Sequence, residues 1–316
     1  MADQFASDDM IISNDLSFRR KKSGYNNFAG YLFIMPWLLG FIFYTVLPMG
    51  MSLYYACTDY NILSAPVWVG LNNFKAIFTN DPRFWQSLKV TFTYVLYAVP
   101  LRLLCALFLA MLFSQKRKLV GLYRTIYYIP SLIGGSVAVA VMWRQLFGVY
   151  GALNSALIAG GLRDSGFGWI THPKTALLSL IVLAAWQFGS PMLIFLAGIK
   201  QIPAALYEVA AIDGANRWQT FFKITLPMLS PVLFFNLIMQ IINNFMMFTQ
   251  AFVITGGQPF DRTLLYILYL YLRGFSYNQM GYACALAWIL LFVVGVITVM
   301  IFKSSPYWVY YEAKED

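Results

Sequence analysis

Residues 207–227 read YEVAAIDGANRWQTFFKITLP, a charged stretch in a chain that is 60% hydrophobic and only 11% charged. The stretch carries Glu208, Asp213, Arg217 and Lys223, and long apolar segments flank it on both sides. Soluble chains are roughly a quarter charged, so this composition indicates that the main solvent of the chain is lipid. The stretch is therefore predicted to connect two membrane-spanning helices.

Six apolar segments are long enough to cross about 30 Å of hydrocarbon at about 1.5 Å per residue. They lie at 29–55, 88–113, 127–147, 176–198, 228–252 and 280–302. A seventh, LLYILYLYL at 264–272, is too short to span and is expected to form an external or interfacial helix. The chain is thus predicted to be an all-α integral membrane protein. Its parts are an N-terminal segment over 1–28, one membrane domain over 29–303 with a loop over 200–227, and a C-terminal tail over 304–316.

The distribution of Lys and Arg predicts the orientation of these spans. With the N-terminus inside, thirteen of the 22 basic residues fall in inner segments, at 19–22, 116–118, 124, 200, 217, 223, 303 and 314. Seven fall in outer segments, at 75, 83, 89, 163, 174, 262 and 273, and two lie within spans, at 102 and 144. Because cytoplasmic loops carry the excess of positive charge, both termini and the 200–227 loop are expected in the cytoplasm. The same rule accounts for the net charge of +9 without nucleic acid as a partner.

Several kinds of site are not expected. The three cysteines have no motif spacing and His172 is the one histidine, so the pattern predicts no disulfide framework, metal site or catalytic residue. GWITHPKT at 168–175 resembles a phosphate-binding loop, but Pro173 stands where the second glycine is required and has no N–H to offer. No acidic residue falls inside a predicted span, which disfavours ion-coupled transport, although a sodium site built from backbone carbonyls stays open. A transporter with this sequence would take its energy from a partner.

The opening stretch itself predicts two short helices. Pro203 suits the first turn of a helix over about 204–213, Gly214 permits a turn that other residues resist, and a second helix over about 216–224 leads to Pro227. Such a pair could insert into a groove on another protein, or it could simply cap the helix bundle at the membrane surface.

The spacing of this stretch resembles the signature of permease subunits of binding-protein-dependent ABC importers, E-A-A-x-x-x-G, nine residues, then I-x-L-P. The chain departs from it at Val209, which stands where the family usually has an alanine, and it matches at Glu208, Ala210, Gly214, Ile224, Leu226 and Pro227. WVGLNNF (68–74), YRTIYYIPSLIGGSVAVAVMWRQLFG (123–148) and MGYACALAWILLF (280–292) also resemble the maltose-type, carbohydrate-uptake members. The likeness covers roughly residues 30–305.

This resemblance implies the ABC type I importer fold and a role for the loop. The loop would be the coupling helix pair that docks on a separate cytoplasmic ATPase, with Glu208 and Asp213 near the docking surface and Gly214 forming the turn. ATP and Mg would be bound by that partner, so this chain needs no cofactor and is not expected to be an enzyme.

Candidate substrate-path residues lie on the predicted fifth span. Four amides fall on one helical stripe at i, i+4, i+7 and i+8, namely Asn236, Gln240, Asn243 and Asn244. Amides and aromatic faces suit the hydroxyls and apolar ring faces of a sugar, whereas hydrogen bonding between helices is the alternative. In maltose-type permeases the helix after the coupling loop lines the sugar site, and Gln240 and Asn244 lie at the matching distance. Further candidates are Trp186 and Gln187 on the fourth span and Ser136 on the third.

Arg102 lies in a predicted span with no acidic partner near it in the sequence. It either faces an aqueous path, where an acidic oligosaccharide would pair with it, or snorkels to an interface. The sequence leaves these alternatives open.

The function expected from the sequence is a permease subunit that moves a sugar or oligosaccharide into a bacterial cell. By resemblance its partners are a second homologous permease, two ATPase subunits, an external solute-binding protein and the lipid of the cytoplasmic membrane. The alternatives are a self-powered secondary carrier or channel, and a permease for another solute such as a glycerol phosphate.

Overall fold

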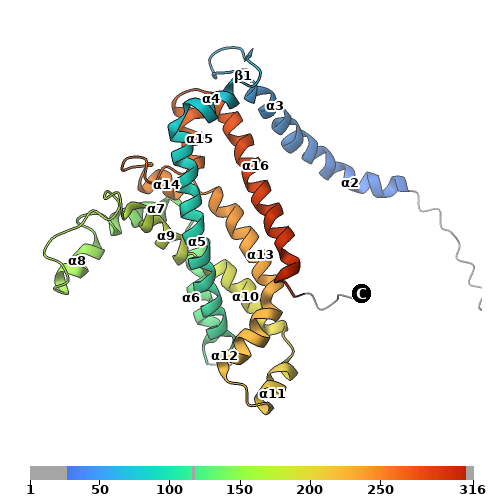
Figure 1. Ribbon diagram of the computed structural model, residues 1–316, viewed down its shortest axis with the longest axis vertical. Helices are drawn as coiled ribbons and strands as arrows, with labels where there is room; N and C mark the ends of the chain where they lie inside the picture. The colour runs from blue at the N-terminus through green and yellow to red at the C-terminus, as the bar shows by residue number, and fades with distance from the viewer. Residues whose placement is uncertain (1–26, 116–117, 311–316) are drawn as a thin grey trace, which may run out of the picture. The chain divides into compact units, whose positions relative to one another are not determined.

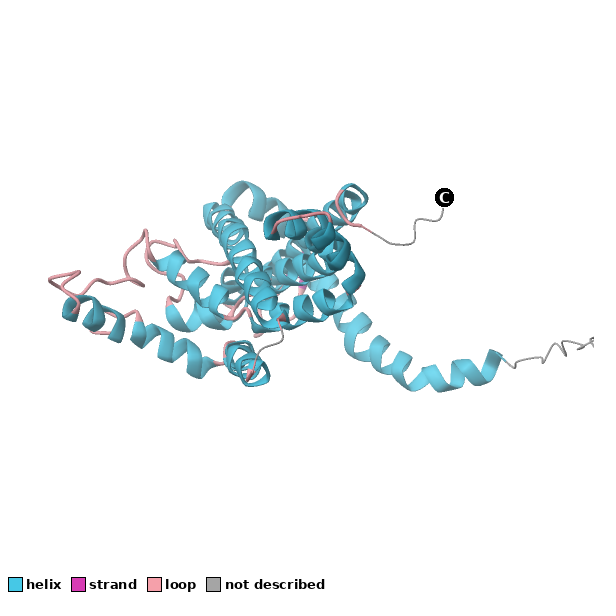
Figure 2. Ribbon diagram, turned by 90° about the horizontal axis from the view of Figure 1, so that it is seen from below, coloured by secondary structure: helices cyan, strands magenta, loops and turns pink. Residues whose placement is uncertain are grey.

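The computed structural model describes residues 27–115 and 118–310, which are almost entirely helical (Figures 1 and 2). Most of the predicted N-terminal segment 1–28 and the end of the predicted tail 304–316 lie outside the described residues. The chain divides into two compact units, Met1–Ser52 and Leu53–Asp316. Each unit is described below by itself.

The first unit contains the predicted first span. Helix α2 (Asn27–Phe41) runs through a π-helical turn, η1 (Ile42–Val46), into α3 (Leu47–Ala56), which ends in the second unit. The N–H of Leu47 bonds the carbonyl of Ile42 across that turn. The turn ends two residues before Pro48, whose ring would clash with a carbonyl four residues back in a regular α-helix. The wider turn lets the helix pass the proline without a break.

The second unit contains the remaining spans and connections. Its strands β1 (Thr58–Asp59) and β2 (Val67–Trp68) form a small antiparallel pair. The helices and turns are α4 (Asn72–Asn80), α5 (Pro82–Ser114), α6 (Val120–Ile133), α7 (Val137–Leu146), α8 (Ala152–Ala159), α9 (Ala176–Trp186), α10 (Gly189–Gln201), α11 (Ala204–Ile212), α12 (Arg217–Thr220), η2 (Phe221–Thr225), α13 (Leu226–Phe245), α14 (Thr249–Ile254), α15 (Tyr266–Tyr271), η3 (Leu272–Ser276), α16 (Met280–Ser304) and η4 (Ser305–Tyr307).

The described residues supply four helices that are long and apolar enough to cross a membrane, or up to six if each bent helix pair counts as one span. The long ones are Gly30–Ala56, Pro82–Ser114, Arg217–Phe245 and Met280–Tyr307. The predicted third span is α6 and α7, bent by 98° at Gly134–Gly135, and the predicted fourth is α9 and α10, bent by 42°. Ser136 caps the second half of the third span, because its Oγ accepts from the Val139 N–H.

Helix α5 is the central element of the second unit. It packs against α9, α10, α13 and α15, and Figure 1 shows it running between the α4 end and the α11–α12 end of that unit. Small and apolar residues such as Ala98, Ala106 and Ala110 are fully buried along it. These small side chains allow neighbouring helices to approach closely. Close van der Waals packing matters in a membrane, because the hydrophobic effect does not drive helices together in lipid.

The short apolar segment predicted at 264–272 forms α15 and the start of η3, so its brevity was correctly inferred. Tyr266, Leu268 and Tyr269 are completely buried against α5 and α16, so the segment is packed into the helix bundle. Tyr266 contributes polar contacts to this packing, since its OH donates to the Leu286 carbonyl and its N–H to Thr91 Oγ1. A short helix can be buried in the bundle when its polar groups find partners there.

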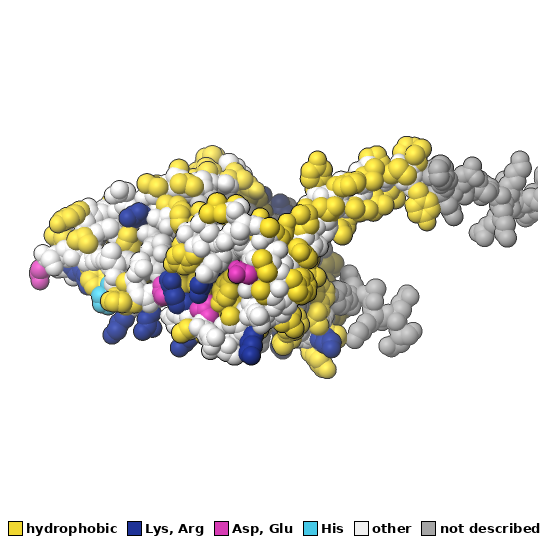
Figure 3. Space-filling view, turned by 90° about the horizontal axis from the view of Figure 1, so that it is seen from above, with side chains coloured by type: hydrophobic (Ala, Val, Ile, Leu, Met, Phe, Trp, Pro, Cys, Tyr) yellow, Lys and Arg dark blue, Asp and Glu magenta, His cyan; other side chains and the backbone are white. Residues whose placement is uncertain are grey.

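At the α4 end of the unit, the carboxylate of Asp81 contacts side chains from several helices. Asp81 is buried at the N-terminus of α5, where it accepts from the Phe84 N–H and from the hydroxyls of Tyr269 and Tyr282. Arg273 completes the cluster with an ion pair of 3.1 Å. The cluster therefore joins α5, α15, η3 and α16 at one point. Figure 3, a view onto this end, shows acidic and basic side chains together on it.

Candidate functional site

The turn between α11 and α12 has the geometry that the sequence predicted. Gly214 has φ +69°, a left-handed conformation that residues with a Cβ resist. The Ala215 N–H bonds the Ala210 carbonyl at 2.9 Å, which closes the end of α11. Asn216 then starts α12 with a reciprocal pair of 2.8 Å bonds to Gln219. Backbone groups at the end of α11 and at the start of α12 thus find hydrogen-bond partners within the turn itself. The shape of the turn therefore does not depend on neighbouring elements.

The second helix of the pair is not separate from the fifth span, as the prediction of a distinct helix over about 216–224 implied. Arg217–Phe245 forms one continuous helix, with the π-helical turn η2 directly before Leu226 and Pro227. The Leu226 N–H bonds the Phe221 carbonyl across this turn, the same arrangement as at Pro48. The helix therefore passes Pro227 without ending, and α12 and α13 form one continuous element.

The loop presents an apolar surface on both sides of Gly214. Ile212 is 85% exposed and Trp218 72% exposed, and Leu206, Val209 and Phe222 are exposed as well. We call these five residues the apolar face of the loop. Ala210 and Thr225 are buried on the opposite side, where Tyr207 and Thr225 share a hydrogen bond of 3.1 Å. The bulk of Val209, the one departure from the family motif, therefore lies at the surface rather than in the packing.

The remaining motif residues divide between surface and interior. Glu208 on α11 and Asp213 directly after it are exposed, and Ile224, Leu226 and Pro227 are partly buried along the helix that follows. Neither carboxylate takes part in an ion pair among the described residues, whose ion pairs lie at Arg83–Asp261 and Arg273–Asp81. Both carboxylates are accordingly accessible to a partner.

A second site is a cavity of about 400 Å³ in the middle of the second unit. Its walls come from α5, from the breaks in the two bent helix pairs, from α13 and from the segment leading into α14. Its polar lining residues are Tyr94, Arg102, Gln187, Ser190, Gln240, Asn243, Asn244, Thr249 and Gln250. The volume falls in the usual range of small-molecule sites. We call it the central pocket.

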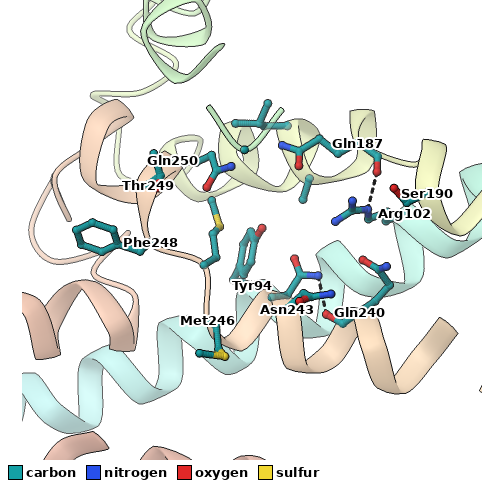
Figure 4. A pocket seen from close by; sticks show the side chains of 15 residues that line it. Tyr94, Arg102, Gln187, Ser190, Gln240, Asn243, Met246, Phe248, Thr249 and Gln250 are labelled. Carbon is teal, nitrogen blue, oxygen red and sulfur yellow. Dashed lines mark hydrogen bonds between the residues drawn. The ribbon is translucent and has the colours of Figure 1, made fainter. Parts of the chain in front are cut away.

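The amide stripe of the fifth span divides between the two roles considered for it. Gln240, Asn243 and Asn244 line the central pocket, and Figure 4 shows Gln240 and Asn243 directed into it from α13. Asn236 is fully buried one turn away, where its Nδ2 lies 3.5 Å from the Pro191 carbonyl on α10. It takes the alternative role of an interhelical contact.

The other predicted path residues are also divided. Gln187 lines the pocket and donates to the Gly134 carbonyl at 3.2 Å. Trp186 is not among the lining residues and packs on Trp143, with ring centroids 5.6 Å apart. Ser136 caps α7 as described above, and its neighbour Gly135 reaches the pocket instead. A Trp-Gln pair at the end of a helix gave no signal of which side chain would turn inward.

Sequence reasoning missed four of the polar lining residues, Tyr94, Ser190, Thr249 and Gln250. Each stands among apolar residues without a helical stripe of amides, and a polar residue in such a setting is as typical of packing as of a binding site. Gln250 donates to the Gly134 carbonyl at 3.0 Å, beside Gln187. That carbonyl is free because the chain bends between α6 and α7. Gln250 could therefore have been identified as a pocket residue only if this bend had been predicted.

Arg102 faces the central pocket, so the structure favours the first of the two alternatives left open for it. Its Nε donates to the Gln187 carbonyl at 2.8 Å, at the break between α9 and α10. Ser131 donates to the same carbonyl at 2.9 Å. Figure 4 shows the guanidinium on the same side of the pocket as Gln240.

Comparison with known proteins places this geometry in a family. Residues 76–305 match the family described as "Binding-protein-dependent transport system inner membrane component". The chain is 56% identical over 293 residues to the probable ABC transporter permease protein YesP of Bacillus subtilis (strain 168), covering 92% of this chain and 94% of that protein. It is 33% identical over 272 residues to the probable starch degradation products transport system permease protein AmyD of Thermoanaerobacterium thermosulfurigenes, covering 85% and 91%.

A solved structure shares the fold. A chain of the bacterial alginate ABC transporter, in complex with an alginate pentasaccharide-bound periplasmic protein, superposes with a TM-score of 0.78. The identity is 22%, and the match covers 91% of this chain and 97% of that one. The likeness confirms the type I importer fold expected from the sequence.

Proposed function

The chain belongs to the family of inner membrane components of binding-protein-dependent transport systems, and on this premise we propose that it is the permease subunit of an ATP-driven importer of oligosaccharides. The observation that carries the substrate class is the central pocket, lined by three amides of α13 and by Gln187. Amides both donate and accept, as hydroxyl-rich ligands require. The relative AmyD is named as a permease for starch degradation products, and this name supports an oligosaccharide as the substrate.

The energy for transport would enter through the loop. We infer that Glu208, Ala210, Asp213, Gly214, Ile224, Leu226 and Pro227 form the coupling element, with the apolar face of the loop docking into a groove of a separate ATPase. Two features support this role: large apolar side chains exposed beside accessible carboxylates, and a helix continuous from α12 to Phe245. Movement of the docked loop would then reach Gln240 and Asn244 through one rigid element.

ATP and Mg would be held by that partner. The 168–175 segment, which resembles a phosphate-binding loop, is occupied by bonds of its own, since the Lys174 N–H donates to His172 Nδ1 and Thr175 Oγ1 to the Trp169 carbonyl. In this proposal the chain itself supplies the substrate path and the coupling element. Its permease domain would cover residues 29–303, with both termini in the cytoplasm.

The proposed complex contains a second homologous permease, two ATPase subunits and an external solute-binding protein. The direct test is purification of the complex from its native membrane, followed by identification of the subunits and measurement of oligosaccharide uptake in proteoliposomes. We expect an ATPase and a binding protein to copurify, and uptake to require ATP inside the vesicles. Uptake by this chain alone, without ATP, would instead identify a self-powered carrier or channel.

A further inference from the structure

Arg102 is the one charged residue among those that line the central pocket, which otherwise carries amides, hydroxyls and apolar groups. Among the described residues the ion pairs are Arg83–Asp261 and Arg273–Asp81, and neither involves Arg102. A charge within a membrane-spanning helix is costly unless it is paired or serves a path through the membrane. The pairing partner of this cation is therefore to be sought in the ligand.

The guanidinium is held in place by one of its five N–H groups. Nε donates to the Gln187 carbonyl, and the two terminal amino groups have no hydrogen-bond acceptor among the described residues. The anchoring bond restricts the position of the guanidinium, and the terminal groups remain available as a two-pronged donor. Such a fork matches the two oxygens of a carboxylate.

A second atom of the pocket lacks a partner. Gln240 is only 6% exposed, and within residues 27–115 and 118–310 its Oε1 finds no hydrogen-bond donor. A buried acceptor without a donor costs free energy, and a hydroxyl of a bound ligand would satisfy it. Gln240 and Arg102 line the same pocket, so one ligand that carries both a carboxylate and hydroxyls could serve both.

We propose that the central pocket recognises acidic oligosaccharides, with Arg102 pairing with the carboxylate of a uronic acid and the α13 amides contacting the neighbouring hydroxyls. The inference rests on the oligosaccharide import proposed above. A single positive charge matches the single negative charge of a carboxylate, whereas a phosphate monoester carries roughly −1.5 to −2 and would leave excess charge in the pocket. A neutral sugar would leave Arg102 unpaired.

The test compares substrates that differ only in this charge. The complete complex is assayed in proteoliposomes with a panel of neutral oligosaccharides, the same oligosaccharides bearing one uronic acid, and glycerol 3-phosphate. Binding of each to the detergent-purified complex, without the external binding protein, is measured by calorimetry so that selection by the permease is seen separately. The variants are Arg102→Gln, Arg102→Lys and Arg144→Gln.

We expect the wild-type complex to prefer the uronic acid members, and Arg102→Gln to weaken their binding at least about tenfold while neutral members change by less than about twofold. Arg102→Lys keeps the charge but loses the fork, so it should fall between. Arg144 is the other arginine in a predicted span, is exposed and does not line the central pocket, so Arg144→Gln should bind as wild type does.

Equal loss for neutral and acidic members in Arg102→Gln, which a purely structural role would give, overturns the proposal. So does a wild-type preference for neutral oligosaccharides or for glycerol 3-phosphate. If the wild-type complex imports no oligosaccharide of either kind, the proposed function is wrong as well. Failure of the acidic preference alone is thus distinguishable from failure of oligosaccharide import.

Discussion

Gly214 is held at φ +69° with no atom near the place where a Cβ would be built. A side chain there meets no clash, so its cost is the left-handed backbone alone, about 1–2 kcal/mol. Replacement by valine should therefore shift the angle between α11 and α12 without unfolding the protein. We expect Gly214→Val to lose uptake while the assembled complex still hydrolyses ATP, as measured in parallel uptake and phosphate-release assays.

Gly161 offers the matched control for this prediction, because it has φ +66° in the segment after α8 and is equally uncrowded. Gly161→Val should carry a similar conformational cost yet keep uptake coupled to hydrolysis. Full uptake in Gly214→Val, or uncoupling in both variants, would remove the loop from the coupling mechanism.

Single residues also show how far sequence reasoning reaches. The fixed spacing around Gly214 predicted the turn correctly, because a left-handed turn needs glycine wherever the helix lies. The amide stripe predicted one face of a helix, but Asn236 and Gln240 received different roles according to what lies opposite each of them. The direction of Arg102 could not be foreseen, since the carbonyl that anchors it is freed by a bend 85 residues away in the chain.

At the scale of elements, Asp81 joins four of them. Burial opposes the ionisation of Asp81, but hydrogen bonds from Tyr269, Tyr282 and the Phe84 N–H, together with Arg273, hold its pKa below the ordinary value of 3.8. Replacing it with asparagine removes a buried charge partner, at a cost of about 3 kcal/mol. We expect Asp81→Asn to lower the midpoint of thermal unfolding of the purified complex at pH 7.

The effect of Asp81→Asn on stability should depend on pH. Because the pKa is lower in the folded state, the charged cluster stabilises the protein fully above about pH 4 and loses this contribution as the pH falls further. The difference between wild type and Asp81→Asn should narrow below about pH 4. Asp164, an exposed carboxylate outside the cluster, gives the control, and Asp164→Asn should unfold as wild type does. A constant difference across this range would show that the cluster does not depend on ionisation.

Bends in elements were the least predictable feature. Hydrophobic length predicted four segments that form long apolar helices and two that form bent helix pairs, because crossing lipid demands mainly length. The predicted fifth span, 228–252, was displaced, since its helix covers Arg217–Phe245 and a separate helix α14 begins at Thr249. Hydrophobic length gave no information on the 98° bend at Gly134–Gly135 or on the continuity of α12 with α13. Both depend on which backbone groups find partners, because Pro227 follows a π-helical turn whereas Pro100 lies inside the continuous helix α5.

For the whole molecule, the distribution of basic residues predicts both termini in the cytoplasm. This can be checked with single cysteines introduced after replacement of the three native ones. Asp164→Cys, in a predicted outer segment, should react in intact cells with a maleimide that does not cross membranes. Gln219→Cys, on α12, should react only after the membrane is permeabilised. The reverse pattern would invert the topology and place the loop where no ATPase could reach it.

The breaks in the helices of the central pocket have a consequence for how this protein can change over evolutionary time. The acceptors at Gly134 and Gln187 are main-chain carbonyls, and no substitution of a side chain deletes a carbonyl of the backbone. These acceptor atoms are thus present whatever the side chain, although a Cβ at Gly134 would lie 2.5 Å from Gln187 and so keeps that position a glycine. The side chains of Arg102, Gln240 and Asn243 are open to substitution. Descendants of this gene that acquire new cargo should therefore diverge on α5 and α13 and retain the two breaks, a pattern that can be sought by directed selection for uptake of an unfamiliar sugar.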